Sequence, residues 1–198
     1  MICPVPRVGE MFRRARNVEA LLFDVDGVFT DGKIIYTTTG EEIKHYDAHD
    51  GQGVKIAQAA GLRVGMISAR ESDAIRVRAA DLKIEILYLG RYDKLNALTE
   101  FIDTYEIEAS RICFMGDDLP DIPVLEQVGF PVAVQNAVAA VKETTPFHTT
   151  RQGGRGAVRE VVEFILYARG IRDEMMEKMN ELHHLAGQEK EDPVDGKK

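Results

Sequence analysis

The sequence predicts an α/β fold in which a doubly wound, mainly parallel sheet is flanked by helices. Short apolar runs alternate with segments of helical spacing, which is the pattern of right-handed βαβ crossovers. Runs such as Ala20–Phe23 and Ile112–Met115 are continuously apolar, as expected of strands that are covered on both faces. A chain of 198 residues is also long enough to bury the core of one such domain.

The elements follow one another in regular order along the chain. Apolar runs predict strands at Ala20–Phe23, Arg63–Ile67, Ile84–Tyr88, Ile112–Met115, Pro131–Val134 and, more weakly, Phe147–Thr149. Helical spacing predicts helices at Gly53–Ala60, Ser72–Leu82, Tyr92–Tyr105, Ile122–Val128, Ala137–Glu143 and Gly156–Ala168. Each of the first four strands is therefore followed by a helix before the next strand begins, apart from one interruption.

The interruption lies between residues 33 and 46. Lys33–Tyr36 and Glu42–Tyr46 flank the polar turn Thr37–Glu41, and this pattern is typical of a β-hairpin. We expect the hairpin either to shelter a site next to it or to pair with another subunit.

The rest of the chain predicts one domain with two appendages. We expect an N-terminal segment over residues 1–17, a core domain over 18–169 and a polar, flexible C-terminal tail over 170–198. Within that tail, Arg172–Leu185 is expected to form at most a marginal helix. We find no internal repeat and no second core.

Charge and composition exclude several classes of function. The net charge of -8 and the pI near 5.2 argue against nucleic acid as a partner and against a polybasic membrane surface. No apolar stretch approaches the length of a membrane span. Two cysteines, Cys3 and Cys113, cannot build a disulfide framework, and the first residues lack the apolar middle of a secretory signal. We therefore expect a cytoplasmic protein.

Polar residues gather where the predicted strands end. Asp24 and Asp26 follow the first strand, Ser68-Ala69-Arg70 follows the second, Lys94 opens the helix after the third, and Asp117-Asp118 with Asp121 follows the fourth. Taken alone, the first pair could be an Asx turn. Because the carboxyl ends of parallel strands share one edge of a sheet, however, all four groups are expected to converge there.

These residue types form one chemical set. Several carboxylates make an oxygen site that suits Mg²⁺. A hydroxyl, a lysine and backbone amides stabilise the oxygens of a phosphoryl group in transfer. An aspartate can attack phosphorus, and a second carboxylate can serve as general acid and base.

The four groups together resemble the ordered motifs of the haloacid dehalogenase superfamily of phosphatases, and the resemblance covers roughly residues 18 to 168. Its motifs are Asp24-x-Asp26-Gly27-x-x-Thr30, Ser68, Lys94 and Gly116-Asp117-Asp118-x-x-Asp121. The resemblance implies a Rossmann-like core and a Mg²⁺ cofactor.

The resemblance also implies a role for each residue. Asp24 is the expected nucleophile and a metal ligand, Asp26 is the general acid and base with its carbonyl on the metal, and Asp117 is a further ligand. Ser68, Ala69, Thr30 and Lys94 are expected around the phosphoryl oxygens. Asp118 and Asp121 are expected to orient Lys94 or metal-bound water, although for Asp118 a plain role at a helix N-terminus is an equal alternative.

Three arginines are candidates for the anionic ends of the substrate. We favour Arg70, because arginine binds a carboxylate bidentately. For Arg155 and Arg159 a site role and an ordinary surface position are equally open. Gly153-Gly154 is either a joint that lets the C-terminal segment close as a lid or a turn before the last helix.

Members of the superfamily usually carry a large cap domain, but this sequence has no room for one in either usual place. Asp31-Gly32, His49–Gly53, Ile67–Arg70 and Gly153–Glu160 resemble the capless members that hydrolyse 3-deoxy-D-manno-octulosonate 8-phosphate. That group implies an acidic sugar phosphate as substrate, a role in lipopolysaccharide precursor synthesis, and a homotetramer with sites at the subunit interfaces.

Two other interpretations remain open at this stage. One is a phosphatase for a nine-carbon ulosonate 9-phosphate of the sialic-acid type, which Arg70 and the double aspartate Asp117-Asp118 disfavour. The other is a non-catalytic assembly module of the same fold, which is disfavoured because all the acids, the lysine and the hydroxyl that the chemistry needs are present.

Overall fold

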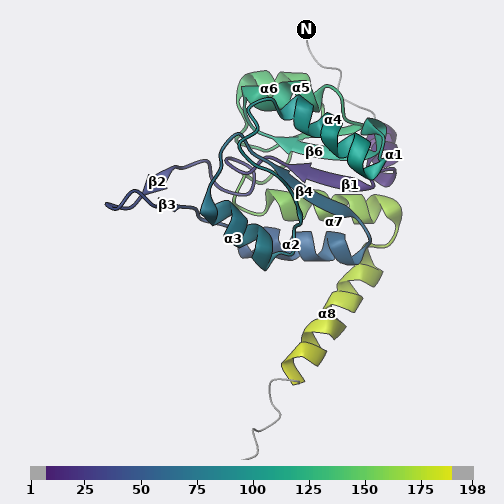
Figure 1. Ribbon diagram of the computed structural model, residues 1–198. Coiled ribbons are helices and arrows are strands. Elements are labelled where there is room, and N and C mark those ends of the chain that lie inside the picture. The colour runs from purple at the N-terminus through teal and green to yellow at the C-terminus, as the bar shows by residue number, and fades with distance from the viewer. Residues whose placement is uncertain (1–7, 189–198) are drawn as a thin grey trace, which may run out of the picture.

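A five-stranded parallel sheet forms the centre of the computed structural model, which describes the backbone of residues 8–188 (Figure 1). The strands are β1 (Ala20–Phe23), β4 (Arg63–Ile67), β5 (Ile86–Tyr88), β6 (Ile112–Gly116) and β7 (Phe130–Ala133), in the order β5-β4-β1-β6-β7. In register, Phe23 at the end of β1 lies between Met66 of β4 and Met115 of β6. The predicted sheet is confirmed, and the ends of its three central strands meet at one edge.

Helices cover both faces of this sheet. The α-helices of the described residues are α1 (Val8–Arg16), α2 (Ala48–Ala59), α3 (Asp73–Asp81), α4 (Lys94–Tyr105), α5 (Ile122–Leu125), α6 (Ala139–Thr144), α7 (Ala157–Arg169) and α8 (Arg172–Gln188), and all but α8 lie against the body of the molecule (Figure 1). Figure 1 shows α2 and α7 on one face and α4, α5 and α6 on the other. All four residues of β1 are buried, because the strand has neighbours on both sides and helices on both faces.

Several elements differ from their expected bounds: α5 ends at Leu125 instead of Val128, β5 begins at Ile86 instead of Ile84, and two elements differ more strongly. Helix α2 begins at Ala48, capped by Asp47, so that Gly51 and Gly53 lie inside the helix instead of before or at its start. These glycines disfavour a helix by propensity, but α2 packs closely on α7: a Cβ at Gly53 would lie 3.0 Å from the Cα of Arg159. Tertiary packing therefore outweighs propensity here. The weak strand at Phe147–Thr149 is reduced to an isolated bridge between His148 and Ala133.

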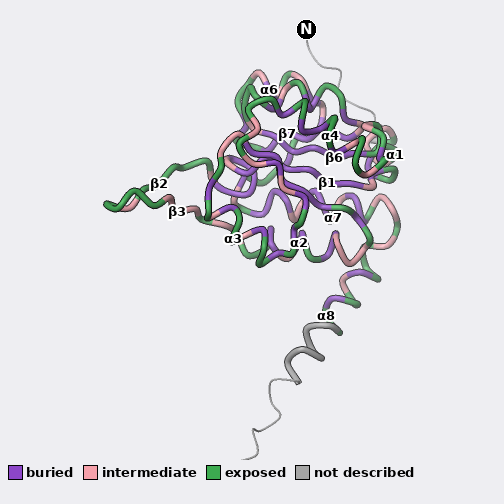
Figure 2. The backbone as a smooth tube through the Cα atoms, in the orientation of Figure 1, coloured by how far each residue is buried: buried purple, intermediate pink, exposed green. Residues whose placement is uncertain are grey.

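The ends of the chain contain more helix than expected. Within the 1–17 segment, α1 packs against α7. The C-terminal segment forms α8, which leaves the body of the molecule in Figures 1 and 2. Met175 and Met179 of α8 are buried, so the first turns of this helix are anchored by apolar contacts that the flexible-tail expectation did not include. Residues 189–198 of the expected tail lie outside the described part of the chain.

The predicted hairpin is present and projects from the body (Figure 1). Strands β2 (Ile35–Tyr36) and β3 (Glu42–Ile43) pair antiparallel in a sheet of their own. Figure 2 shows much of this segment as exposed. The side chains of Ile34 and Tyr36 are among the exposed large apolar residues. In residues 24–62, all of which the structure describes, the hairpin and α2 are the only helices or strands, so no cap domain is inserted there.

A buried carboxylate, Asp50, joins helix α2 to the start of helix α7. Asp50, in the first turn of α2, is 1% exposed and accepts hydrogen bonds from the backbone N–H groups of Gly156 (3.1 Å) and Arg159 (3.0 Å). Burial raises the pKa of this carboxyl, against those hydrogen bonds. Asp50 thus caps the N-terminus of α7 from another helix. Among residues 8–188, no helix is long and apolar enough to cross a lipid bilayer.

Asp50→Ala is expected to lower the free energy of unfolding by about 2 kcal/mol, because two buried N–H groups lose a charged acceptor. Urea unfolding monitored by circular dichroism measures the change. Asp173→Ala is the matched control, since the Asp173 side chain in the first turn of α8 is 95% exposed. Equal stability of the Asp50 and Asp173 variants would contradict the capping role.

Candidate active site

The end of β1 places Asp24 at the edge of the sheet. The Asp24 N–H donates to the carbonyl of Met115 on β6 (3.0 Å), which continues the strand pairing by one residue, and Asp24 is 6% exposed. Burial, together with the charge of Asp121, raises the pKa of Asp24 to about 6. A carboxyl in this position is held rigidly and is poorly solvated.

The loop after β1 turns back over the strand ends. The Thr30 hydroxyl accepts hydrogen bonds from the N–H groups of Gly27 (3.3 Å) and Gly32 (3.2 Å), and Thr30 is 1% exposed. Its oxygen is therefore engaged by the loop backbone. Thr30 therefore shapes the loop that carries Asp24 and Asp26, and its expected contact with phosphate stays a prediction.

Glycine is required where this loop meets the end of β6. Gly27 has a φ of +103°, and a Cβ there would lie 2.1 Å from Asp117 Oδ2. On its other side, a Cβ at Gly153 would lie 1.6 Å from the carbonyl oxygen of Gly27. Gly153 and Gly154 thus pack tightly against the loop, and the Gly154 N–H donates to Val28 O (2.9 Å). This packing favours the turn over the joint of a lid.

Lys94 supplies the positive charge beneath these carboxylates. It is the first residue of α4 and is 4% exposed. Its Nζ lies 2.7 Å from Asp24 Oδ1 and 2.6 Å from Asp121 Oδ1. The sequence prediction that Lys94 joins the aspartates is confirmed by this geometry.

Asp121 links the lysine to the end of β6. Its second oxygen, Oδ2, accepts hydrogen bonds from the N–H groups of Asp117 (2.8 Å) and Asp118 (3.2 Å). Asp118 is exposed and caps the short 3₁₀ helix Leu119–Asp121 through its own side chain. Asp121 therefore contacts both Lys94 and the Asp117 backbone. Asp118 caps the 3₁₀ helix, as one of the two alternatives expected, and a role for it in the site stays a prediction.

Three carboxylates form a cluster with room for a cation. Oxygens of Asp24, Asp117 and Asp121 lie within 4.8 Å of one another. Burial and the neighbouring Asp24 raise the pKa of Asp117 to about 8. Asp117 Oδ1 is buried and has no hydrogen-bond partner among the described residues. A hard divalent cation such as Mg²⁺ would supply the missing partner and relieve the repulsion, so the residues present fit this ion.

The end of β4 contributes the second predicted group. Ser68 is 1% exposed, and its hydroxyl oxygen accepts a hydrogen bond from the Arg70 N–H (3.1 Å). The Ser68 N–H and carbonyl pair with Tyr88 O and Arg91 N, so β5 and the loop after it hold this turn in place. Ala69 lies between Ser68 and Arg70 and is partly buried.

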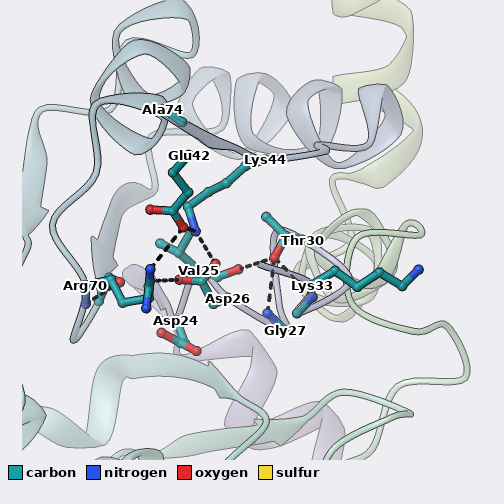
Figure 3. A network of polar contacts seen from close by, with 12 residues as sticks. Asp24, Val25, Asp26, Gly27, Thr30, Lys33, Glu42, Lys44, Arg70 and Ala74 are labelled. Carbon is teal, nitrogen blue, oxygen red and sulfur yellow. Dashed lines mark hydrogen bonds and ion pairs between the residues drawn. The ribbon is translucent and has the colours of Figure 1, made fainter. Parts of the chain in front are cut away.

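Asp26 faces the hairpin (Figure 3). Its Oδ1 accepts a hydrogen bond from Lys44, and its Oδ2 lies 4.0 Å from Arg70 Nε. Glu42 completes the group with ion pairs to Lys44 (2.7 Å) and to Arg70 Nη2 (3.4 Å). Arg70 thus reaches the site as predicted. Lys44 and Glu42 were missed, because the sequence shows only that they belong to a hairpin and not where it folds back.

The remaining arginines do not join the described contacts of the carboxylate cluster. Arg159 Nε pairs with Glu163 (2.5 Å) on α7, so this guanidinium is already occupied. Arg155 is exposed beside Asp31, whose pKa is lowered by its hydrogen bond with Lys33 and, more weakly, by the Arg155 charge. Arg155 therefore lies on the Asp31 side of the loop, and the structure shows no partner that ties it to the cluster.

The sequence is similar to known phosphatases over most of its length. The sequence profile of the haloacid dehalogenase-like hydrolases matches residues 69–161. The 3-deoxy-D-manno-octulosonate 8-phosphate phosphatase of Escherichia coli K12 is 37% identical over 172 residues, which is 87% of this chain and 92% of that protein. Its counterpart from Yersinia pestis is 39% identical over 84% of this chain and 89% of that protein.

Solved structures of such phosphatases have a fold similar to that of this chain. The Moraxella catarrhalis 3-deoxy-D-manno-octulosonate 8-phosphate phosphatase, crystallised with a magnesium ion, phosphate and the sugar acid, has a TM-score of 0.85 at 34% identity and covers 87% of this chain and 99% of that one. The Yersinia pestis enzyme has a TM-score of 0.82 at 38% identity and covers 83% and 89%. With this sequence identity and this agreement in fold, the chain belongs to the haloacid dehalogenase superfamily of hydrolases and is a phosphatase of its capless group.

Proposed function

We propose that this protein is a Mg²⁺-dependent phosphomonoesterase that hydrolyses 3-deoxy-D-manno-octulosonate 8-phosphate to the free sugar acid and phosphate, within lipopolysaccharide precursor synthesis. The observation that carries the chemistry is the Asp24 carboxylate, fixed by Lys94 beside the open oxygen of Asp117. The names of the curated relatives and the bound sugar acid in the Moraxella catarrhalis structure support the substrate.

In this proposal Asp24 attacks phosphorus and forms an aspartyl phosphate. Asp26 donates a proton to the leaving oxygen and then accepts one from the water that hydrolyses the aspartyl phosphate. Lys94 and Ser68 hold the phosphoryl oxygens, and Lys94 also offsets the charge of Asp24. Asp24, Asp117 and the Asp26 backbone carbonyl hold Mg²⁺, which neutralises negative charge on the transferring group when it is bound.

We also propose that the protein associates with copies of itself and is located in the cytoplasm. The apolar side chains of Ile34, Ile35 and Ile43 on the hairpin are exposed, and burying them between subunits would favour self-association into the homotetramer that the capless group implies. A cytoplasmic location is supported by Cys113, a buried free thiol.

Asp24→Asn is expected to lower kcat on the order of 10³-fold or more, because an amide does not attack phosphorus as a carboxylate does. Phosphate release in the presence of Mg²⁺ measures kcat, and circular dichroism verifies the fold. Asp103→Asn, an exposed aspartate of α4, is the matched control and should retain full activity. Turnover by the Asp24 variant at the wild-type rate would rule out this nucleophile.

Saturating Mg²⁺ is expected to raise the melting temperature, since an ion at 100 times its Kd contributes about 2.7 kcal/mol of stability. Thermal melts with Mg²⁺ and with EDTA measure the shift. Asp117→Asn should abolish the shift, whereas Asp118→Asn should keep it, because Asp118 only caps the 3₁₀ helix. An equal Mg²⁺-dependent shift in both variants would remove Asp117 from the ligand set.

The eight-carbon sugar acid phosphate is expected to have a higher kcat/KM than a nine-carbon ulosonate 9-phosphate, by about tenfold or more, because one lost optimal contact costs about 1.4 kcal/mol. Steady-state phosphate release with both compounds measures the ratio. A preference for the nine-carbon compound would contradict the proposed substrate but not the proposed phosphatase chemistry.

A further inference from the structure

The hairpin segment places a charged side chain directly on Asp26, because Lys44 follows the end of β3 (Glu42–Ile43). Lys44 Nζ donates to Asp26 Oδ1 and also lies 2.7 Å from Glu42 Oε1. Glu42 in turn pairs with Arg70 Nη2 at 3.4 Å, and Arg70 donates to the Tyr36 hydroxyl at 2.9 Å. Figure 3 shows this network, in which Lys44 and Glu42 come from the hairpin segment, Arg70 from the loop after β4 and Asp26 from the loop after β1. The hairpin is therefore joined to the site of its own subunit by ion pairs and hydrogen bonds.

Because the Lys44 side chain is buried, its ammonium group needs these carboxylate partners. Its side chain is only 1% exposed, while the Asp26 and Glu42 side chains are 18% and 13% exposed. A buried ammonium group without partners is strongly unfavourable, and breaking a buried pair costs several kcal/mol. Since water does not reach Lys44, its ammonium group is confined to these two carboxylates. Asp26 Oδ1 is thereby held in one position.

The other oxygen of Asp26 is left open. Asp26 Oδ2 is buried, and neither it nor Arg70 Nε has a hydrogen-bond partner among the side chains that the structure describes. The two atoms face each other across 4.0 Å. An oxygen placed between them could accept a hydrogen bond from Arg70 Nε and a proton from Asp26 Oδ2. Such a gap suits the leaving oxygen of a phosphate ester.

We propose that Lys44 is a positioning residue that holds Oδ1 of Asp26 so that Oδ2 is directed at the leaving oxygen, with Glu42 keeping Lys44 in place. This inference rests on the proposed function. When Asp24 bonds to phosphorus, the ester P–O bond breaks, its electron pair stays on the leaving oxygen, and the proton on Asp26 Oδ2 moves to that oxygen. The hairpin thus belongs to the active site as well as to the exposed surface.

The test compares two leaving groups. An alkoxide needs the proton, whereas p-nitrophenolate leaves without one, and kcat/KM reports the step in which the leaving group departs. Lys44→Met keeps the side-chain length but removes the charge. It should lower kcat/KM for an alkyl sugar phosphate on the order of 10²-fold and for p-nitrophenyl phosphate less than about 5-fold. Lys44→Arg should restore part of the alkyl activity.

Two further variants make the result specific. Lys33→Met is the matched control, because Lys33 is also on the hairpin segment but its side chain is 70% exposed; it should leave both rates unchanged. In an Asp26→Asn background, Lys44→Met should cause no additional loss, because a positioning residue acts only through the group that it positions. If Lys44→Met does not fold, Glu42→Gln carries the test and should show the same selective loss to a smaller extent.

Equal losses for the two esters, or an additional loss in the Asp26→Asn background, would overturn the positioning role. Failure of the proposed function is recognised separately, because Asp24→Asn would then retain the wild-type rate with both esters. The two hypotheses therefore give different patterns with the same substrates.

Discussion

The buried ion pairs of Lys94 are the interaction on which the site depends. Lys94 is held between Asp24 and Asp121, and none of the three is more than 6% exposed. Buried charges of this kind are tolerated only when each has its partner, so removing one leaves the others uncompensated. Because they come from the end of β1, the start of α4 and the segment after β6, the pairs also fix how these elements meet.

The second constraint on the site is that the backbone of the loop after β1 lies very close to Asp117 and to the segment before α7. Gly27 allows Asp117 to lie directly against the loop after β1, and Gly153 allows the segment before α7 to pack on the Gly27 carbonyl. The capping of α7 by Asp50 holds this segment from the other side. The glycines and the cap therefore position the carboxylate cluster although none of them takes part in the chemistry.

The hairpin follows the loop that carries Asp24 and Asp26, and it links two environments. Its apolar side chains Ile34, Ile35 and Ile43 are exposed, while Lys44 at its base is buried against Asp26. A second subunit that covers the exposed part would thus hold a segment that is ionically bound to the proposed acid and base. Assembly and catalysis can share one short element because Ile43, the last residue of β3, is exposed, while the side chain of the next residue, Lys44, is buried against Asp26.

The sequence by itself determined the parallel sheet, the hairpin and the convergence of Asp24, Lys94, Asp117 and Asp121, since continuous apolar runs identify buried strands and parallel strands end at one edge. Only the tertiary structure decided the partners of Asp26, the capping role of Asp50, the backbone role of Thr30 and the position of Arg159 on α7. It also decided that α2 continues through Gly51 and Gly53 and that α8 is a helix anchored by Met175 and Met179. The reason is physical. The periodicity of apolar residues shows which residues are buried, and the order of the strands shows which strand ends meet. The contact of Lys44 with Asp26 depends on how the hairpin folds back onto the site, which the local sequence does not encode.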